Sequence, residues 1–175
     1  MRTQAKGSRG VFLSRENVGP NTWDEAMECI GGSGVMEDCI MPRLFRESPI
    51  NTIWEGSGNV QCLDMIRAMN RNPESLDAFM NEVHKAEGKH PLMNRSLSDL
   101  QAELSDKNDV EYRSRRIVEK MALTIQASTL LQYGKAEVAD AYCKARLDVP
   151  NHGWVYGTLP RGIDCASLIA RAKPC

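Results

Sequence analysis

The sequence has no long apolar run, and this excludes a helix that spans a membrane. Crossing a bilayer takes about 20 consecutive apolar residues, and no stretch of the 175 residues approaches that length. No segment alternates apolar and polar residues with a period of two, so strands are not expected. Because 42% of the residues are apolar and 26% are charged, we expect a soluble, all-α protein with antiparallel, bundle-like packing.

The sequence also has almost no net charge and no closely spaced pair of cysteines. The formal net charge is −1 at pH 7, so the overall charge gives no case for nucleic acid. The six cysteines contain no Cys-x-x-Cys pair, which favours reduced, structural thiols over disulfides or zinc. His84, His90 and His152 share no ligand spacing, so no metal site is expected. These features favour a reducing compartment, the cytoplasm or the mitochondrial matrix, over secretion.

Residues 1–19 form a candidate leader segment. The segment is basic and contains hydroxyl groups, as transit peptides do, but Glu16 and the weak amphipathicity argue against one. We therefore interpret it as a disordered or unrelated leader.

The first helix is expected over residues 22–30, with Asn21 as its cap and glycines as its terminator. Residues 31–58 are rich in Gly, Ser and Pro, and we expect them to be irregular. Solvated ion pairs, rather than ligand contacts, are expected within that segment for Arg43 and Arg46 with Glu37 or Glu47.

Apolar residues at helical spacing predict the other helices. Ser57 or Asn59 is expected to cap the first of them, over residues 59–70. Its inward face is expected to carry Val60, Leu63, Ile66 and Met69. The remaining helices are expected from Pro73 to about Gly88, around Leu97, Leu100 and Leu104, over 109–132, over 135–147, and from Asp164 onward with Leu168, Ile169 and Ala172 buried.

Two glycine-containing segments are candidates for ligand contact. Gly31, Gly32 and Gly34 lack a Cβ, which suits a tight turn or the close approach of a ligand. The backbone N–H groups of the turn from Ser57 to Asn59, where a helix begins, could hold a phosphate. From the residues alone, helix stops and turns are the better-supported alternative.

Glu55 lies in the second of these segments, between Trp54 and Gly56. A carboxylate held against an indole in a partly dry site is expected to have a raised pKa, which makes it a competent base. A surface glutamate in a turn is the alternative, and the residues alone favour it.

The segment "ECIGGSGVMEDCIMPRLFRESPINTIWEGSGNVQCLDMIRAM" resembles the carboxyl-terminal part of a flavin-dependent acyl-CoA dehydrogenase. The "WEGSGN" form and the closing "YGTLPRGIDCASLIARA" are similar to the alkylation-response (AidB-like) branch of that family. The resemblance covers about residues 20–175. It implies the end of the family's C-terminal helical domain over residues 20–88 and a helical carboxyl-terminal extension over 89–175.

The resemblance implies an oligomeric enzyme that uses FAD and an acyl-CoA substrate. Glu55 would remove the α-proton while a hydride passes from Cβ to the flavin, which leaves a 2-enoyl thioester. The domains that normally precede this region have no counterpart here, so the chain alone is expected to be inactive and to need the rest of the enzyme or other copies. The implied cofactor-binding residues are Gly31, Gly32, Gly34, Trp54, Gly56, Ser57 and Asn59.

The alternative function is a non-enzymatic oligomerisation or DNA-associated module, because the alkylation-response branch is associated with DNA. The candidate DNA contacts form the only dense basic stretch: Arg113, Arg115, Arg116 and Lys120. Glu111 and Glu119 dilute it, so a solvated helix face is favoured and any DNA binding is expected to be weak. Trp154 and Tyr156 are interpreted as a loop anchor rather than a base-stacking platform.

Overall fold

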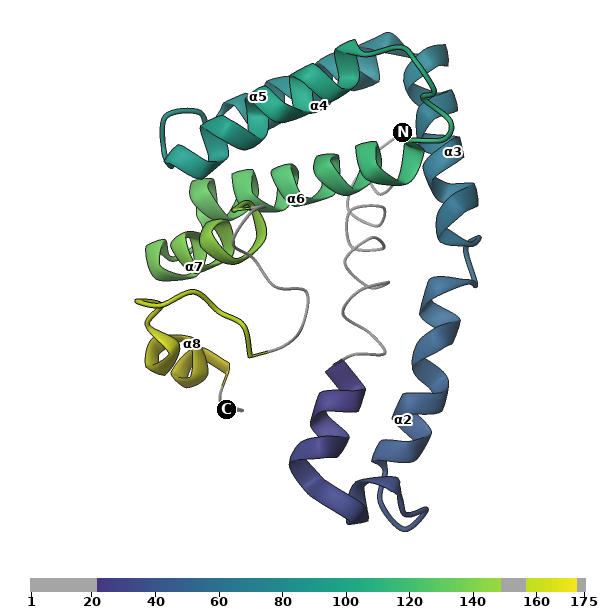
Figure 1. The fold of residues 1–175 in the computed structure, drawn as a ribbon, viewed down its shortest axis with the longest axis vertical. Helices are drawn as coiled ribbons and strands as arrows, with labels where there is room; N and C mark the ends of the chain where they lie inside the picture. Colours follow the sequence, from purple (N-terminus) through teal and green to yellow (C-terminus); the bar gives the residue numbers. More distant parts are fainter. Residues whose placement is uncertain (1–21, 149–156, 173–175) are drawn as a thin grey trace. The chain divides into compact units, whose positions relative to one another are not determined.

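A computed structural model describes residues 22–148 and 157–172 (Figure 1). Every regular element within those ranges is helical, which confirms the all-α class. The chain divides into two compact units, Met1–Ile66 (unit 1) and Arg67–Cys175 (unit 2). Across the described ranges, no helix combines the length and apolar character needed to cross a membrane.

Unit 1 is a succession of short helical segments. Residues 22–30 are helical, as expected, whereas the expected cap Asn21 lies outside the described residues. The elements that follow are the 3₁₀ helix η1 (Gly31–Val35), α2 (Met41–Glu47), the 3₁₀ helix η2 (Ser48–Thr52) and the start of α3 (Gly58–Arg71). Both η1 and η2 contact α2.

The expectation that residues 31–58 are irregular is wrong where α2 forms. Pro42 occupies the first turn of α2, where its missing N–H costs nothing. Met41 and Pro42 are buried, and Arg43 pairs with Glu47 one turn later at 3.0 Å. Local pairing and burial therefore outweigh a composition typical of loops.

The helix expected over residues 59–70 is confirmed as α3, but its buried face differs from the expected one. Val60 is 55% exposed, whereas Gly58, Cys62 and Ile66 are buried. These three residues are spaced by four, so they share one face of the helix. The buried face therefore includes a glycine and a cysteine, which a pattern of large apolar residues does not mark as buried.

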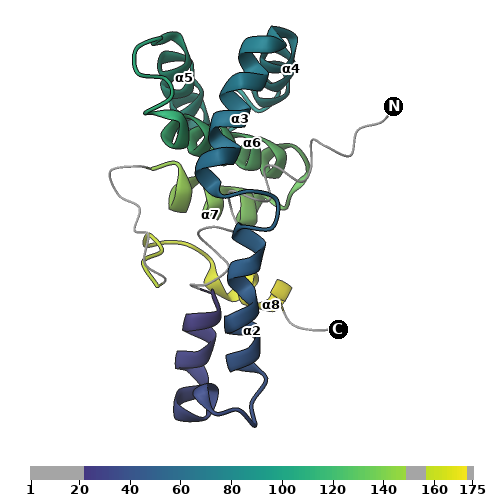
Figure 2. The same ribbon diagram turned by 90° about the vertical axis from the view of Figure 1, so that its right-hand side faces the viewer.

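After the end of α3, the described part of unit 2 contains a bundle of four helices and a short fifth one. Their bounds are α4 (Pro73–His84), α5 (Pro91–Ser105), α6 (Ser114–Tyr133), α7 (Ala136–Arg146) and α8 (Cys165–Ala172). Helices α4, α5 and α6 run in alternating directions, and α6 contacts α4, α5 and α7 (Figures 1 and 2). Gly134 ends α6 and the chain turns back into α7, which confirms the expected helical pair.

The core of the bundle lies around α6. On α5, Met93, Leu97 and Leu100 are buried at helical spacing. The buried residues of α6 include small side chains, among them Ala122, Ala127 and Ser128, which let neighbouring helices approach closely. The central cluster comprises Val83, Ala86, Met93, Leu97, Ala127, Cys143 and Leu147.

Several expected boundaries and burials in unit 2 are wrong. Helix α4 ends at His84 rather than near Gly88, and residues 85–88 form a turn. Helix α5 is fifteen residues long rather than short. Helix α6 begins five residues later than expected, because Asp109 adopts a φ of +47° that interrupts a helix. In α8, Ile169 and Ala172 are exposed and only Leu168 is half-buried.

Candidate functional site

Glu55 lies in a turn between η2 and α3, and backbone hydrogen bonds define the shape of this turn. The N–H of Trp54 donates to the carbonyl of Ile50 and the N–H of Gly56 to that of Ile53, each at 3.0 Å. Gly56 has a φ of +110°, a conformation that favours glycine. The turn therefore has a specific backbone path that requires Gly56.

The side chains of Trp54 and Glu55 are both exposed, Trp54 by 59%. No described residue forms a hydrogen bond or an ion pair with the Glu55 carboxylate, although its backbone carbonyl accepts a hydrogen bond from Gln61 Nε2. The expected dry setting is therefore not formed by the described residues. Another surface would have to cover the indole and the carboxylate to exclude water.

Helix α3 begins directly after this turn. The carbonyl of Ser57 accepts the N–H of Gln61 at 3.0 Å, so Ser57 stands at the cap position. Gly58 follows it and is buried, and Asn59 is exposed in the first turn. First-turn N–H groups have no partner within a helix, which makes this a physically suitable place for an anionic group.

The first glycine segment separates into residues with different structural roles. Gly31 has a φ of +75°, which favours glycine. A Cβ at Gly32 would meet no atom of the described residues within 4 Å. A Cβ at Gly34 would lie 2.8 Å from the backbone oxygen of Met27, so Gly34 is required by internal packing. A Cβ at Gly31 would also meet no atom of the described residues within 4 Å, so Gly31 and Gly32 both have an open side, and only Gly32 combines it with a backbone conformation that other residues adopt.

The two glycine segments occupy different parts of unit 1, because α2 and η2 lie between them along the chain (Figure 1). The arginines of α2 form the expected ion pairs: Arg43 with Glu47 at 3.0 Å and Arg46 with Glu37 at 2.7 Å. The hydrogen bond and the charge of Arg46 hold the pKa of Glu37 below its usual value. These pairs are exposed, which confirms that they are solvated.

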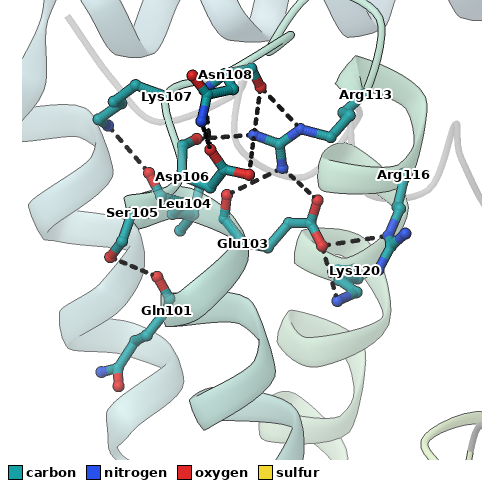
Figure 3. Close-up of polar contacts among 10 residues, drawn as sticks. All are labelled: Gln101, Glu103, Leu104, Ser105, Asp106, Lys107, Asn108, Arg113, Arg116 and Lys120. Carbon is teal, nitrogen blue, oxygen red and sulfur yellow. Dashed lines mark hydrogen bonds and ion pairs between the residues drawn. The ribbon is translucent and has the colours of Figure 1, made fainter.

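The basic stretch of unit 2 surrounds a buried carboxylate, Glu103, at the end of α5 (Figure 3). Glu103 accepts hydrogen bonds from Arg113 Nη1 at 2.5 Å and from Lys120 Nζ at 3.0 Å. Arg116 Nε lies 3.2 Å from the same carboxylate. Three of the four candidate DNA contacts are therefore engaged by one residue of the preceding helix.

Arg113 also binds the backbone where α5 ends. Its guanidinium donates to the carbonyls of Asp106 and Asn108, both at 2.8 Å, and its side chain is only 17% exposed. Orphan carbonyls at a helix end need such donors. Arg113 is thus a structural residue, and the expectation of a wholly solvated helix face is wrong for it.

The environment of Glu103 acts on its pKa in two directions. Burial raises the pKa, but hydrogen bonds from Lys120 and Arg113 and the charges of Lys120 and Arg116 outweigh burial and hold it below the usual value. Glu103 was not predicted from the sequence. A glutamate adjoining the apolar stripe of Leu97, Leu100 and Leu104 was the available signal.

Binding of duplex DNA remains a prediction, and we expect it to be weak. Glu103 pairs with the other three basic side chains, and Glu111 and Glu119 flank the stretch, so it presents little net positive charge to a phosphate. Substituting Arg115 by alanine should therefore barely change the dependence of affinity on salt. Fluorescence anisotropy with labelled duplex DNA at several salt concentrations measures that slope. A slope of roughly −3 to −4 that flattens by about one unit in Arg115→Ala would contradict this expectation.

His90 and Cys143 have structural roles. His90 Nδ1 accepts the N–H of Leu92 at 3.1 Å and so caps α5. Burial raises the pKa of the Cys143 thiol to about 11, which makes it a poor nucleophile at neutral pH. No cluster of three or more His, Cys, Asp or Glu side chains suited to a metal occurs within the described ranges. His152, Trp154 and Tyr156 lie outside those ranges.

Comparisons with known proteins confirm the resemblance. Residues 15–70 match the family described as acyl-CoA dehydrogenase, C-terminal domain. The chain is 36% identical over 124 residues to the putative acyl-CoA dehydrogenase AidB of Escherichia coli (strain K12). This alignment covers 71% of the chain and 23% of that protein. It is 41% identical over 64 residues to acyl-CoA dehydrogenase family member 11 of Caenorhabditis elegans, which covers 37% of this chain and 10% of that protein.

The chain therefore spans less than a quarter of the length of these two curated relatives. The family match begins at residue 15, inside the segment interpreted as an unrelated leader. It ends at residue 70, close to the division between the two structural units. The expected boundary at residue 88 between a C-terminal domain and an extension stays a prediction.

Proposed function

The chain is a member of the acyl-CoA dehydrogenase family, in its AidB-like branch, and from that premise we propose that it forms the carboxyl-terminal portion of an FAD-dependent enzyme in which Glu55 is the catalytic base. One observation carries the proposal: the Glu55 carboxylate is exposed and bound by no described residue, in a glycine-dependent turn directly before α3. A base must be free to reach the proton it removes.

The residues present fit an extended anionic cofactor. The start of α3 offers backbone N–H groups, and Ser57 and Asn59 add polar side chains beside them. Trp54, the residue before Glu55, presents an exposed apolar ring. The open side of Gly32 supplies a second surface, separated from the first by α2 and η2. Two separate contact surfaces are compatible with a cofactor shared between copies of the chain.

The chemistry proposed for Glu55 is removal of a proton from the carbon α to a thioester carbonyl. The Cα–H electron pair becomes the new Cα=Cβ bond as a hydride leaves Cβ, and the product is a 2-enoyl thioester. FAD, when bound, would accept that hydride. Exclusion of water from Trp54 and Glu55 would favour the neutral form of the carboxyl group after proton transfer.

We also propose that unit 1 packs against another polypeptide, either a second copy or the rest of the enzyme. Most of the large apolar side chains that are exposed among the described residues belong to unit 1. Such a concentration is typical of an interaction surface. These side chains are Ile30, Val35, Met36, Ile40, Phe45, Ile50, Ile53, Trp54 and Val60.

The proposed function is tested by the visible spectrum of the purified chain, alone and in an assembly that supplies an acyl-CoA dehydrogenase flavin domain. We expect the assembly to retain flavin. We expect Gly32→Val to lose flavin or to fail to assemble while its far-UV circular dichroism is unchanged, because a Cβ at this position meets no atom of the described residues within 4 Å.

Gly34→Ala is the matched packing variant. Its Cβ meets the Met27 carbonyl, so it should lower the free energy of unfolding by roughly 1–3 kcal/mol. A colourless wild-type assembly would contradict the proposed function and favour a non-enzymatic module. Full flavin retention by Gly32→Val would remove Gly32 from the cofactor surface.

A further inference from the structure

The side chain of Gln61 connects the first turn of α3 to the residue proposed as the base. Its Nε2 group donates a hydrogen bond to the backbone carbonyl of Glu55. We infer that Gln61 is a positioning residue. It holds the peptide of Glu55 against α3 and so fixes the position from which the Glu55 side chain extends. This inference rests on the proposed function of Glu55.

The geometry of Gly56 shows that the turn is built around this side chain. A Cβ at Gly56 would lie 3.0 Å from Gln61 Nε2 and 3.7 Å from Val60 Cγ1. The glycine therefore leaves the space that the Gln61 amide occupies, in addition to adopting a φ of +110°. Residue 56 and the amide at position 61 form one structural feature.

Backbone hydrogen bonds connect the turn to η2, whereas the side chain of Gln61 connects it to α3. On the η2 side, the carbonyls of Ile50 and Ile53 bind the N–H groups of Trp54 and Gly56. On the α3 side, the Gln61 amide binds the carbonyl of Glu55. Gly56 and Gly58 flank this peptide closely, and glycine backbones rotate most easily. Without the amide, the peptide between Glu55 and Gly56 would be held only by the hydrogen bond from the Gly56 N–H to Ile53, beside a glycine whose backbone rotates easily.

Rotation of the peptide would move the carboxylate relative to the start of α3. A reacting group displaced by about 1 Å can lose up to about 10²-fold in rate. Since Gln61 acts on the backbone and not on the substrate, its loss should lower kcat and leave KM nearly unchanged.

The first test uses the full 175-residue chain and needs no flavin. Hydrogen exchange of the Gly56 amide is followed by NMR in wild type and in Gln61→Met, which keeps the length of the side chain but cannot donate. We expect exchange about fivefold faster in Gln61→Met, the effect of losing one typical hydrogen bond. The matched control is Asn70→Met, which replaces an exposed amide on the same helix that no described residue binds; it should leave Gly56 exchange unchanged.

The second test measures kcat and KM for an acyl-CoA substrate in the flavin-containing assembly. We expect Gln61→Met to lower kcat about tenfold, within the range that misplacement allows, and Gln61→Lys to restore most of it, because an ammonium group can donate to the same carbonyl. Unchanged Gly56 exchange, or unchanged kcat in an active assembly, would overturn the inference. An assembly that is inactive in wild type refutes the proposed function instead, and Gly56 exchange then decides the role of Gln61 alone.

Discussion

Glu55→Gln is expected to lower acyl-CoA oxidation at least ~10²-fold, because an amide cannot accept the α-proton of the thioester. The substitution preserves the size of the side chain, and no described residue binds the carboxylate, so the fold should be unaffected. Steady-state oxidation in the flavin-containing assembly measures the loss. Flavin retention, read from the visible spectrum, should equal that of wild type.

The matched control is Glu28→Gln, which neutralises another exposed carboxylate of unit 1 with no partner among the described residues. It should leave the rate unchanged, which would show that loss of a negative charge alone does not explain the effect. If Glu55→Gln oxidised acyl-CoA at the wild-type rate, Glu55 would have no role as the base, although the family relationship would stand.

Glu103→Gln is expected to lower the free energy of unfolding by about 3 kcal/mol, the lower end of what removal of one partner from a buried ion pair costs. Arg113 is 17% exposed and Lys120 29% exposed, so water can only partly replace the lost carboxylate. Urea denaturation followed by circular dichroism measures this change. Glu111→Gln, an exposed neighbour in the α5–α6 connection, is the control and should change stability by less than about 0.5 kcal/mol.

The contribution of Glu103 should also depend on pH in a known direction. Its pKa is lowered in the folded protein, so the stabilisation is present above the unfolded pKa of about 4.3 and is lost as the pH falls through the folded pKa. The difference in stability between wild type and Glu103→Gln should therefore shrink below about pH 4. A difference that stayed constant down to lower pH would show that the charge of Glu103 does not stabilise the fold.

Apolar residues at helical spacing, together with local residues that begin and end helices, were sufficient to predict most helices. Helix α5 follows from Leu97 and Leu100 at helical spacing, and α8 begins where Asp164 accepts the N–H of Ser167 at 3.1 Å. Arg46 and Glu37 were paired from sequence because they are close along the chain. Helix α2 was missed because its stability depends on burial of Met41 and Pro42, which composition does not reveal.

In the candidate site, too, features that are local in the sequence could be predicted and contacts that depend on the fold could not. The sequence placed Glu55 next to Trp54 in a glycine-rich turn before a helix, because all of these features are local. It could not show that a side chain six residues away binds the Glu55 carbonyl, or that Gly34 is needed for packing whereas Gly32 is open. Those facts depend on where the backbone passes in three dimensions.

By itself, then, the sequence determined the all-α class and most helix positions, since each follows from periodicity or capping. The choice of Glu55 as the candidate base came from the resemblance of a contiguous motif and stays a prediction. Only the tertiary structure decided that Arg113, Arg116 and Lys120 converge on Glu103. Ten to seventeen residues separate Glu103 from these cations along the chain. They meet because α5 and α6 pack together in opposite directions, and a contact made by packing leaves no periodic signal in the sequence.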